Sequence, residues 1–217
     1  KSYLLNHLFG TAFDVSGGRC TDGVWLSMKQ VKGRSFVILD FEGLGTSERK
    51  AQEDMLLSLL NAAVSRLTIF RSEMCFDKLT QTLFRRMQSS TGQLQQDDDE
   101  LFRGPFVVAV KDVQHKPQEV RQEFMEKIQQ MSKNTQNPFL KVLYGGKVNI
   151  VCFPGISQGK FYRQIKDLKK EIRECVPYPN GTAFMTNIKL LMSKIALLDW
   201  TSTSEAKIAQ RVSAVQA

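Results

Sequence analysis

Three short polar motifs combine residue types that bind phosphate, magnesium or a purine base elsewhere in protein chemistry. They are Lys1-Ser2, Asp40-Phe41-Glu42-Gly43 and Lys111-Asp112. The first precedes an apolar helical pattern, and the other two each follow a short apolar run typical of a buried strand. Ligands in sheets of parallel strands bind in the loops at the carboxyl ends of the strands. The sequence therefore predicts that these residues meet at one site.

Lys1-Ser2 matches the last two residues of the phosphate-binding pattern G-x-x-x-x-G-K-[ST]. In that arrangement backbone amides and a helix N-terminus hold phosphates. The Lys1 ammonium would reach the β- and γ-phosphates of a nucleotide, and the Ser2 hydroxyl would ligate Mg²⁺. The alternative is that a Lys-Ser pair at this place has no chemical role.

Asp40 and Gly43 supply the second part of the expected site. An aspartate at a strand end can hold a magnesium ion through water, and a glycine three residues later can offer its backbone N–H to a γ-phosphate. The alternative is an ordinary turn at the end of a strand.

Lys111-Asp112 supplies an expected contact to a base. A carboxylate can accept hydrogen bonds from N1–H and the exocyclic amine of guanine, whereas adenine would leave it unpaired at a cost of about 1–3 kcal/mol. The Lys111 side chain would lie along the plane of the base. The alternative is a solvated ion pair.

Thr21 lies in a polar stretch, residues 11–22, that matches no helical or strand pattern. A loop of this length is typical of a functional segment. Thr21 fits a switch residue that closes on Mg²⁺ and the γ-phosphate and releases them after hydrolysis. Arg19 has the chemistry of an arginine finger, but a solvated loop arginine explains it as well. The motifs follow one another in the order expected of a GTPase domain.

The chain resembles the large dynamin-related GTPases of the guanylate-binding protein and atlastin group, including the very large interferon-inducible GTPases. That group has K-S-x-L-x-N, T-x-G-[IV]-W and D-x-E-G-L-G. Here the corresponding stretches are Lys1-Ser2-Tyr3-Leu4-Leu5-Asn6, Cys20-Thr21-Asp22-Gly23-Val24-Trp25 and Leu39-Asp40-Phe41-Glu42-Gly43-Leu44-Gly45. The matches cover most of the first 112 residues, and beyond Asp112 the resemblance is thin.

The resemblance implies that the domain hydrolyses GTP with Mg²⁺ and dimerises through its nucleotide face. It assigns Lys1 and Ser2 to the phosphates, Ser2, Thr21 and Asp40 to the metal, Thr21 and Gly43 to the reacting γ-phosphate, and Lys111 and Asp112 to the base. It also implies a base-covering loop that begins at Cys152-Phe153-Pro154-Gly155. Lys111 stands where the group has arginine, which changes the base contact.

Helical and strand patterns alternate along the chain, which predicts an α/β fold with a mostly parallel sheet covered by helices on both faces. Together with the resemblance, this implies a P-loop GTPase-type three-layer fold. Trp25 is expected in the core. Residues 88–100 read as a solvated loop. The helical patterns cover 2–9, 53–64, 77–87, 117–131, 159–174 and 184–198, and the strand patterns cover 24–28, 36–39, 67–70, 105–110 and 148–153.

Residues 1–200 are expected to form a GTPase domain that lacks its first strand and the glycine-rich half of the phosphate loop. Residues 201–217 are expected to be a C-terminal helix or a linker toward an absent helical region. The four cysteines have no metal-binding spacing and indicate reduced thiols in a cytoplasmic protein. Association with a membrane would come through regions that are not present.

The net charge of +8 attracts anions but does not choose among nucleotide, lipid and nucleic acid. The 217 residues contain no repeat and no aromatic RNA-binding signature, which disfavours a nucleic-acid module. Two alternatives to a GTPase stay open: a scaffold that keeps the fold without turnover, and a basic nucleic-acid module. The first gains weight because no residue in the sequence is identified as positioning the attacking water.

Overall fold

The computed structural model describes residues 2–15, 23–41, 43–44, 51–91, 102, 104–133, 135 and 138–196. The elements in chain order are α1 (Ser2–Phe9), β1 (Val24–Val31), β2 (Arg34–Phe41), α2 (Ala51–Val64), β3 (Thr68–Ser72), α3 (Lys78–Ser90), β4 (Phe106–Val110), α4 (Pro117–Ser132), α5 (Phe139–Tyr144), β5 (Val148–Cys152), α6 (Gly159–Glu174) and α7 (Gly181–Ala196).

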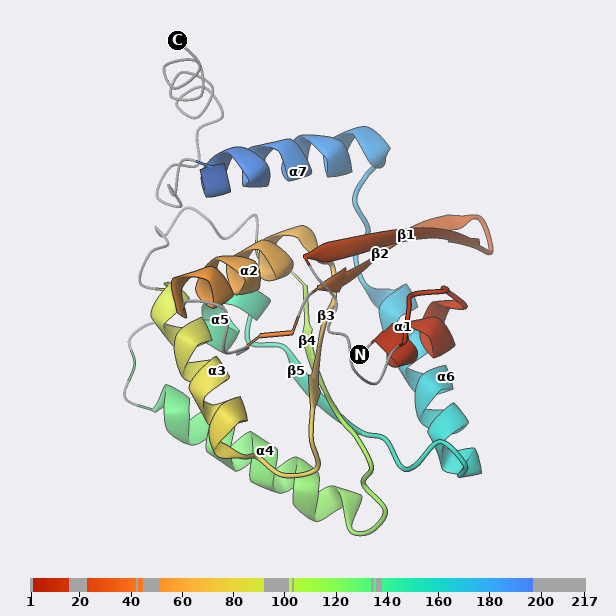
Figure 1. Cartoon of the computed structure of the whole chain (residues 1–217), viewed down its shortest axis with the longest axis vertical. Coiled ribbons are helices and arrows are strands. Elements are labelled where there is room, and N and C mark those ends of the chain that lie inside the picture. Colours follow the sequence, from red (N-terminus) through yellow and green to blue (C-terminus); the bar gives the residue numbers. More distant parts are fainter. Residues whose placement is uncertain are drawn as a thin grey trace.

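A parallel sheet with the strand order β3-β4-β5 stands at the centre of the domain. Figure 1 shows α2, α3, α4 and α5 on one side of these strands and α1 and α6 on the other. The predicted α/β class, a sheet between two helical layers, is confirmed.

The central strand β4 is apolar and buried along its whole length. Its side chains alternate between the two faces of the sheet, so Phe106 and Val108 pack into the larger core with α2 to α5. Val107 and Ala109 pack into the smaller core with α1 and α6. Burial on both faces explains the uninterrupted apolar run.

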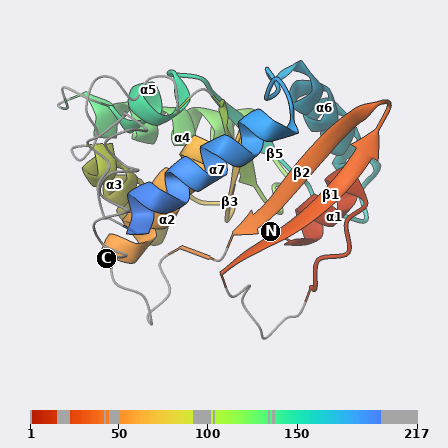
Figure 2. The same ribbon diagram turned by 90° about the horizontal axis from the view of Figure 1, so that it is seen from above.

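Strands β1 and β2 form an antiparallel hairpin, and among the described residues it does not pair with the central sheet. Lys32 and Gly33 connect the strands, and both have positive φ, 50° and 76°. A two-residue turn with positive φ at both positions matches the twist of a hairpin, and glycine adopts it at little cost. Figures 1 and 2 show the hairpin beside α7 and apart from β3-β4-β5.

The hairpin differs from expectation in its burial. Residues 36–39 were predicted as a strand covered on both faces, but Ile38 is buried while Phe36, Val37 and Leu39 are only half-buried. The prediction of a core position for Trp25 is wrong, because that side chain is 60% exposed. Trp25 lies on β1, in which every residue is exposed or half-buried, so this strand is not part of a core.

The structure also corrects the sequence-based boundaries of α3. The helix begins after Asp77, whose carboxylate accepts a hydrogen bond from the Thr80 amide at 2.7 Å, which lowers the pKa of that carboxyl. It continues to Ser90, which is buried, so residues 88–90 are not part of a solvated loop. The Gln88 side chain accepts a hydrogen bond from the Phe139 amide at 2.9 Å. Residues 92–100 lie outside the described part.

Helix α5, which has six residues, was not predicted because Phe139 to Tyr144 is too short for a helical repeat to show. No helix in the described ranges combines the length and apolar character needed to cross a bilayer. The three cysteines within those ranges, Cys75, Cys152 and Cys175, are free thiols.

Gly104, just before β4, allows the backbone to approach the end of α2 closely. A Cβ at this position would lie 2.7 Å from the Ser65 carbonyl oxygen and 2.8 Å from the Arg66 carbonyl carbon. Both are backbone atoms, so a side chain at position 104 would force the backbone to shift. We expect Gly104→Ala to lower the free energy of unfolding by about 1–3 kcal/mol, measured by urea denaturation.

Gly155→Ala is the matched control, because a Cβ at Gly155 meets no atom within 4 Å. Equal stability of the two variants would contradict the close approach at Gly104.

Candidate functional site

A cavity of about 1580 Å³ opens between the hairpin and the central sheet. It is lined by every described residue that the sequence assigned to the site: Ser2, Asp40, Gly43, Lys111 and Asp112. The structure therefore brings these five residues to one cavity, while their chemical roles stay predictions. Lys1, Thr21 and Arg19 lie outside the described residues.

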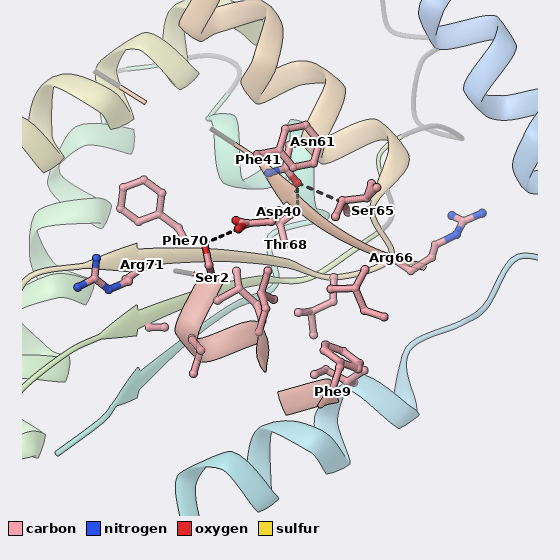
Figure 3. A pocket seen from close by; sticks show the side chains of 18 of the residues that line it. Ser2, Phe9, Asp40, Phe41, Asn61, Ser65, Arg66, Thr68, Phe70 and Arg71 are labelled. Carbon is pink, nitrogen blue, oxygen red and sulfur yellow. Dashed lines mark hydrogen bonds between the residues drawn. The ribbon is translucent and has the colours of Figure 1, made fainter. Parts of the chain in front are cut away.

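Ser2 and Asp40 form the buried end of this group. The Ser2 Oγ donates a hydrogen bond of 2.5 Å to the Asp40 Oδ2, and both side chains are buried. Figure 3 shows the two side chains pointing toward each other from the first turn of α1 and from β2, with Phe70 and Arg71 of β3 nearby. This hydrogen bond attaches the start of α1 to the carboxyl end of β2.

The donor chemistry of this pair fits a magnesium ion. Mg²⁺ prefers hard oxygen ligands and keeps several waters, so one hydroxyl and one carboxylate are a sufficient protein contribution. The Ser2 hydroxyl donates its hydrogen bond to Asp40, which leaves the lone pairs of the Ser2 oxygen available to a cation. Within the described ranges, no three His, Cys, Asp or Glu side chains cluster as a metal site would.

Gly43 faces open space at the same cavity. A Cβ built on this residue meets no atom within 4 Å, and the residue itself is half-buried. This position leaves room for a ligand atom to approach the amide, as the sequence pattern requires.

Lys111 and Asp112 follow β4 directly. Asp112 adopts the left-handed backbone region with φ of 58°, a conformation that aspartate tolerates better than most residues. Its carboxylate is exposed at the cavity, with 65% of the side chain accessible. An exposed acceptor on a strained loop residue is common at functional sites.

Glu73, which the sequence analysis did not identify, holds the Lys111 side chain. The Lys111 Nζ lies 2.9 Å from Glu73 Oε2 and 3.7 Å from Asp112 Oδ2. The Lys111 backbone amide donates to the Ser72 carbonyl at 3.1 Å, so the last residue of β3 and the residue after it position both ends of this lysine. Glu73 is exposed and belongs to none of the motifs, so the sequence gives no signal for this role.

The loop after β5 is joined to the loop after β4. The Phe153 amide donates to the Val110 carbonyl at 2.8 Å, and the Val113 amide donates to the Phe153 carbonyl at 2.9 Å. Pro154 consequently lines the same cavity as Asp112. This geometry suits a loop that covers a base, which is the role the resemblance gives to residues 152–155.

Asn6 is a second residue whose role the sequence analysis did not identify. Its side chain accepts hydrogen bonds from the Thr11 Oγ1 at 2.7 Å and the Phe13 amide at 3.0 Å, and it donates to the Phe13 carbonyl at 2.9 Å. It thereby fixes the first residues of the segment that leads toward Thr21. The only sequence signal is one asparagine at the end of K-S-x-L-x-N.

Comparisons with known proteins give a local similarity. Stretches of 61 residues are 51% identical to Protein SEY1 homolog 1 and Protein SEY1 homolog 2 of Paramecium tetraurelia, and 39% identical to Protein sey1 of Neurospora crassa. Each match covers 25–26% of this chain and only 7–8% of the relative's length. No family model matches. The similarity supports, at a coarse level, the resemblance to atlastin-like dynamin-related GTPases.

Replacing Asn6 with alanine tests whether this side chain holds the segment after α1. We expect Asn6→Ala to lower the free energy of unfolding by about 1–3 kcal/mol and to speed hydrogen exchange at the Phe13 amide, because three hydrogen bonds are lost.

The Gly10 amide is an internal control for that measurement, since it donates to the backbone carbonyl of Asn6 at 2.8 Å, which the substitution keeps. Equal acceleration at Gly10 and Phe13 would mean that the whole of α1 loosens, and the specific role of Asn6 would be rejected.

Proposed function

We propose that this chain is part of a GTPase domain that binds GTP with Mg²⁺ and hydrolyses it to GDP and phosphate. The observation that carries the proposal is the shared cavity of Ser2, Asp40, Lys111 and Asp112, which come from three separate parts of the sequence. The local similarity to Sey1 proteins supports the GTPase assignment at a coarse level.

Ser2 and Asp40 are the proposed phosphate and metal end of the site. Ser2 would ligate Mg²⁺ through Oγ, and the buried Asp40 would orient that hydroxyl and accept hydrogen bonds from metal-bound water. When bound, Mg²⁺ neutralises charge on the phosphate oxygens. The Lys1 ammonium would contact the β- and γ-phosphates.

Lys111 and Asp112 are the proposed base end. The exposed Asp112 carboxylate would accept two hydrogen bonds from guanine, and the Lys111 stem, held by Glu73, would lie along the ring. Adenine presents an acceptor at N1, so it would face the carboxylate without a donor. The base end would therefore favour GTP over ATP, whereas the phosphate and metal end would treat the two nucleotides alike.

Gly43 and Thr21 are the proposed switch residues. The Gly43 amide would donate to the γ-phosphate, and Thr21 would close on the metal, so the two loops are ordered only while the triphosphate is present. Hydrolysis would proceed by in-line attack of water, with positioning and electrostatics supplying most of the acceleration. Ordered switch loops would form the surface on which a second GTPase domain dimerises.

The proposed domain comprises residues 1–200 together with upstream residues that supply the glycine-rich half of the phosphate loop. Residues 201–217 would lead toward a helical region. The proposed location is the cytoplasm, with peripheral membrane association through other parts of the polypeptide. Nucleic acid is not a proposed partner.

Asp112→Asn tests the base contact. An amide in place of the carboxylate turns one acceptor into a donor that faces the guanine N–H groups, so we expect fluorescent GTP analogue binding to weaken about 10- to 100-fold in the full polypeptide. Asp167→Asn, on the exposed side of α6 and outside the cavity, is the matched control. Unchanged affinity in Asp112→Asn would remove this residue from the proposed site.

Ser2→Ala tests the metal contact and also separates a GTPase from a scaffold. We expect the unchanged protein to release phosphate in a Mg²⁺-dependent manner, and the variant to lose about 100-fold or more of that rate, because the hydroxyl ligand is gone. Ser193→Ala, in α7 and outside the cavity, is the control.

Two results would overturn parts of this proposal. Tight GTP binding without phosphate release in the unchanged protein would favour the scaffold. RNA competing with GTP, with a steep dependence on salt, would favour the nucleic-acid module.

A further inference from the structure

Carboxylates surround the part of the cavity where the phosphates of a nucleotide would lie. Asp40 is buried at the end of β2, and Glu73 and Asp112 are exposed just after β3 and β4. Carboxylates repel phosphate, so a phosphate chain needs cations at this carboxyl-end rim. Among the described residues that line the cavity, four have cationic side chains: Arg34, Arg66, Arg71 and Lys111.

Two of these four cations are held at the opposite end of the cavity. Arg34, at the start of β2, donates to the Arg173 carbonyl at 2.7 Å. Arg66, just before β3, stacks on Tyr178 at 3.8 Å from the ring centroid. Each arginine is thus separated from the carboxyl-end rim by the length of a strand.

The other two cations lie at the carboxyl-end rim and differ in how firmly they are held. The Lys111 Nζ lies between two carboxylates, 2.9 Å from Glu73 Oε2 and 3.7 Å from Asp112 Oδ2. Arg71 has one ion pair, in which its Nη2 lies 3.9 Å from Glu73 Oε1, and its side chain is 37% exposed. A partly exposed ion pair of this length contributes little to stability, so a ligand can replace it. Of the four cations, Arg71 is therefore the most available to a phosphate.

Strand β3 places Arg71 on the face of the sheet that α1 covers. Arg71 pairs with Ala109 in the register of β3 and β4, and Ala109 packs into the smaller core with α1 and α6. Ile69, two residues before Arg71, packs against the same core. Because side chains alternate along a strand, Arg71 shares this face with Ile69.

Helix α1 begins at the same rim. Its first residue, Ser2, bonds Asp40 at the end of β2, and its last residue, Phe9, contacts the Phe36 ring near the start of β2. Figure 3 shows Ser2 at the Arg71 end of β3 and Phe9 toward its other end. The first turn of α1, whose backbone amides attract anions, and the Arg71 side chain thus lie at one rim.

Glu73 lies between the two cations of the rim. Its Oε1 faces Arg71 and its Oε2 faces Lys111, so one carboxylate sets the spacing of both side chains. Lys111 belongs to the proposed base end, and Ser2 belongs to the proposed metal end. Arg71 is connected to the first through Glu73 and shares a sheet face with the helix that begins at the second, so it stands where the phosphates join the two ends.

We infer that the Arg71 guanidinium binds the phosphate chain of the nucleotide and that Glu73 positions Arg71 and Lys111 relative to each other. A guanidinium can donate two parallel hydrogen bonds to phosphate oxygens, and it stays charged at any physiological pH. Neither Arg71 nor Glu73 belongs to the motifs of the sequence. The inference rests on the proposed function and adds a phosphate contact to it.

Arg71→Ala tests the phosphate contact. Binding of GTP, GDP and guanosine is measured by isothermal titration calorimetry with Mg²⁺ in the full polypeptide. We expect GTP and GDP to bind about tenfold more weakly or worse, and guanosine to bind as before, because only the nucleotides carry phosphate. Arg71→Lys keeps the charge without the paired hydrogen bonds, so it should recover part of the loss.

Arg34→Ala is the matched control, because it removes the same side chain from the opposite end of the same cavity. We expect this variant to bind all three ligands as the unchanged protein does.

Glu73→Gln tests the positioning role, with inorganic tripolyphosphate and guanosine as separate probes. The change removes a negative charge beside Arg71 and weakens the hold on Lys111. We therefore expect tripolyphosphate to bind about two- to fivefold more tightly and guanosine about two- to fivefold more weakly. A merely structural role would weaken both.

The outcomes separate this inference from the proposed function. GTP and GDP affinities that do not change in Arg71→Ala, or an equal loss for guanosine, would overturn the phosphate contact while GTP binding by the unchanged protein stands. Changes in one direction for both probes in Glu73→Gln would overturn the positioning role. An unchanged protein that binds no guanine nucleotide would overturn the proposed function and this inference together.

Discussion

The complete burial of β4 on both faces is the constraint on which the rest of this domain depends. Its five residues have no exposed face, so helices must cover the strand from both sides. The alternation of its side chains divides the interior into two cores, one with α2 to α5 and one with α1 and α6. Each core is filled in part by phenylalanine rings in edge-to-face or tilted contact, such as Phe84 with Phe106 and Phe153 with Phe161.

A strand held this firmly also fixes the loops that leave it. Lys111 and Asp112 follow the last buried residue of β4, and backbone hydrogen bonds to Ser72 and Phe153 hold this turn between the ends of β3 and β5. The loops are polar because they lie at the rim, where the cores end and side chains reach the cavity. A rigid strand with polar residues at its carboxyl end is the usual way in which a parallel sheet presents a binding site.

The Ser2–Asp40 hydrogen bond connects this rim to the hairpin. It joins two residues 38 positions apart and is buried, so its loss would leave a carboxylate in the interior with one fewer donor. This hydrogen bond fixes the start of α1 against the end of β2. Asn6 in turn binds Thr11 and Phe13, which lie in the segment that leads toward Thr21. A ligand bound at Ser2 and Asp40 would therefore contact the helix whose Asn6 holds the segment leading toward the proposed switch residue Thr21.

Sequence alone determined the α/β class, most helices, the three parallel strands and the order of the polar motifs, because helical periodicity and apolar runs are local properties. It misplaced Trp25, missed α5 and ended α3 too early, since burial and the Gln88–Phe139 hydrogen bond depend on distant residues. Only the tertiary structure decided that Ser2, Asp40 and Asp112 line one cavity, that Glu73 holds Lys111, and that residues of β2 and β3 border the same cavity. Those facts depend on how strands are paired and layered, which spacing along one chain does not specify.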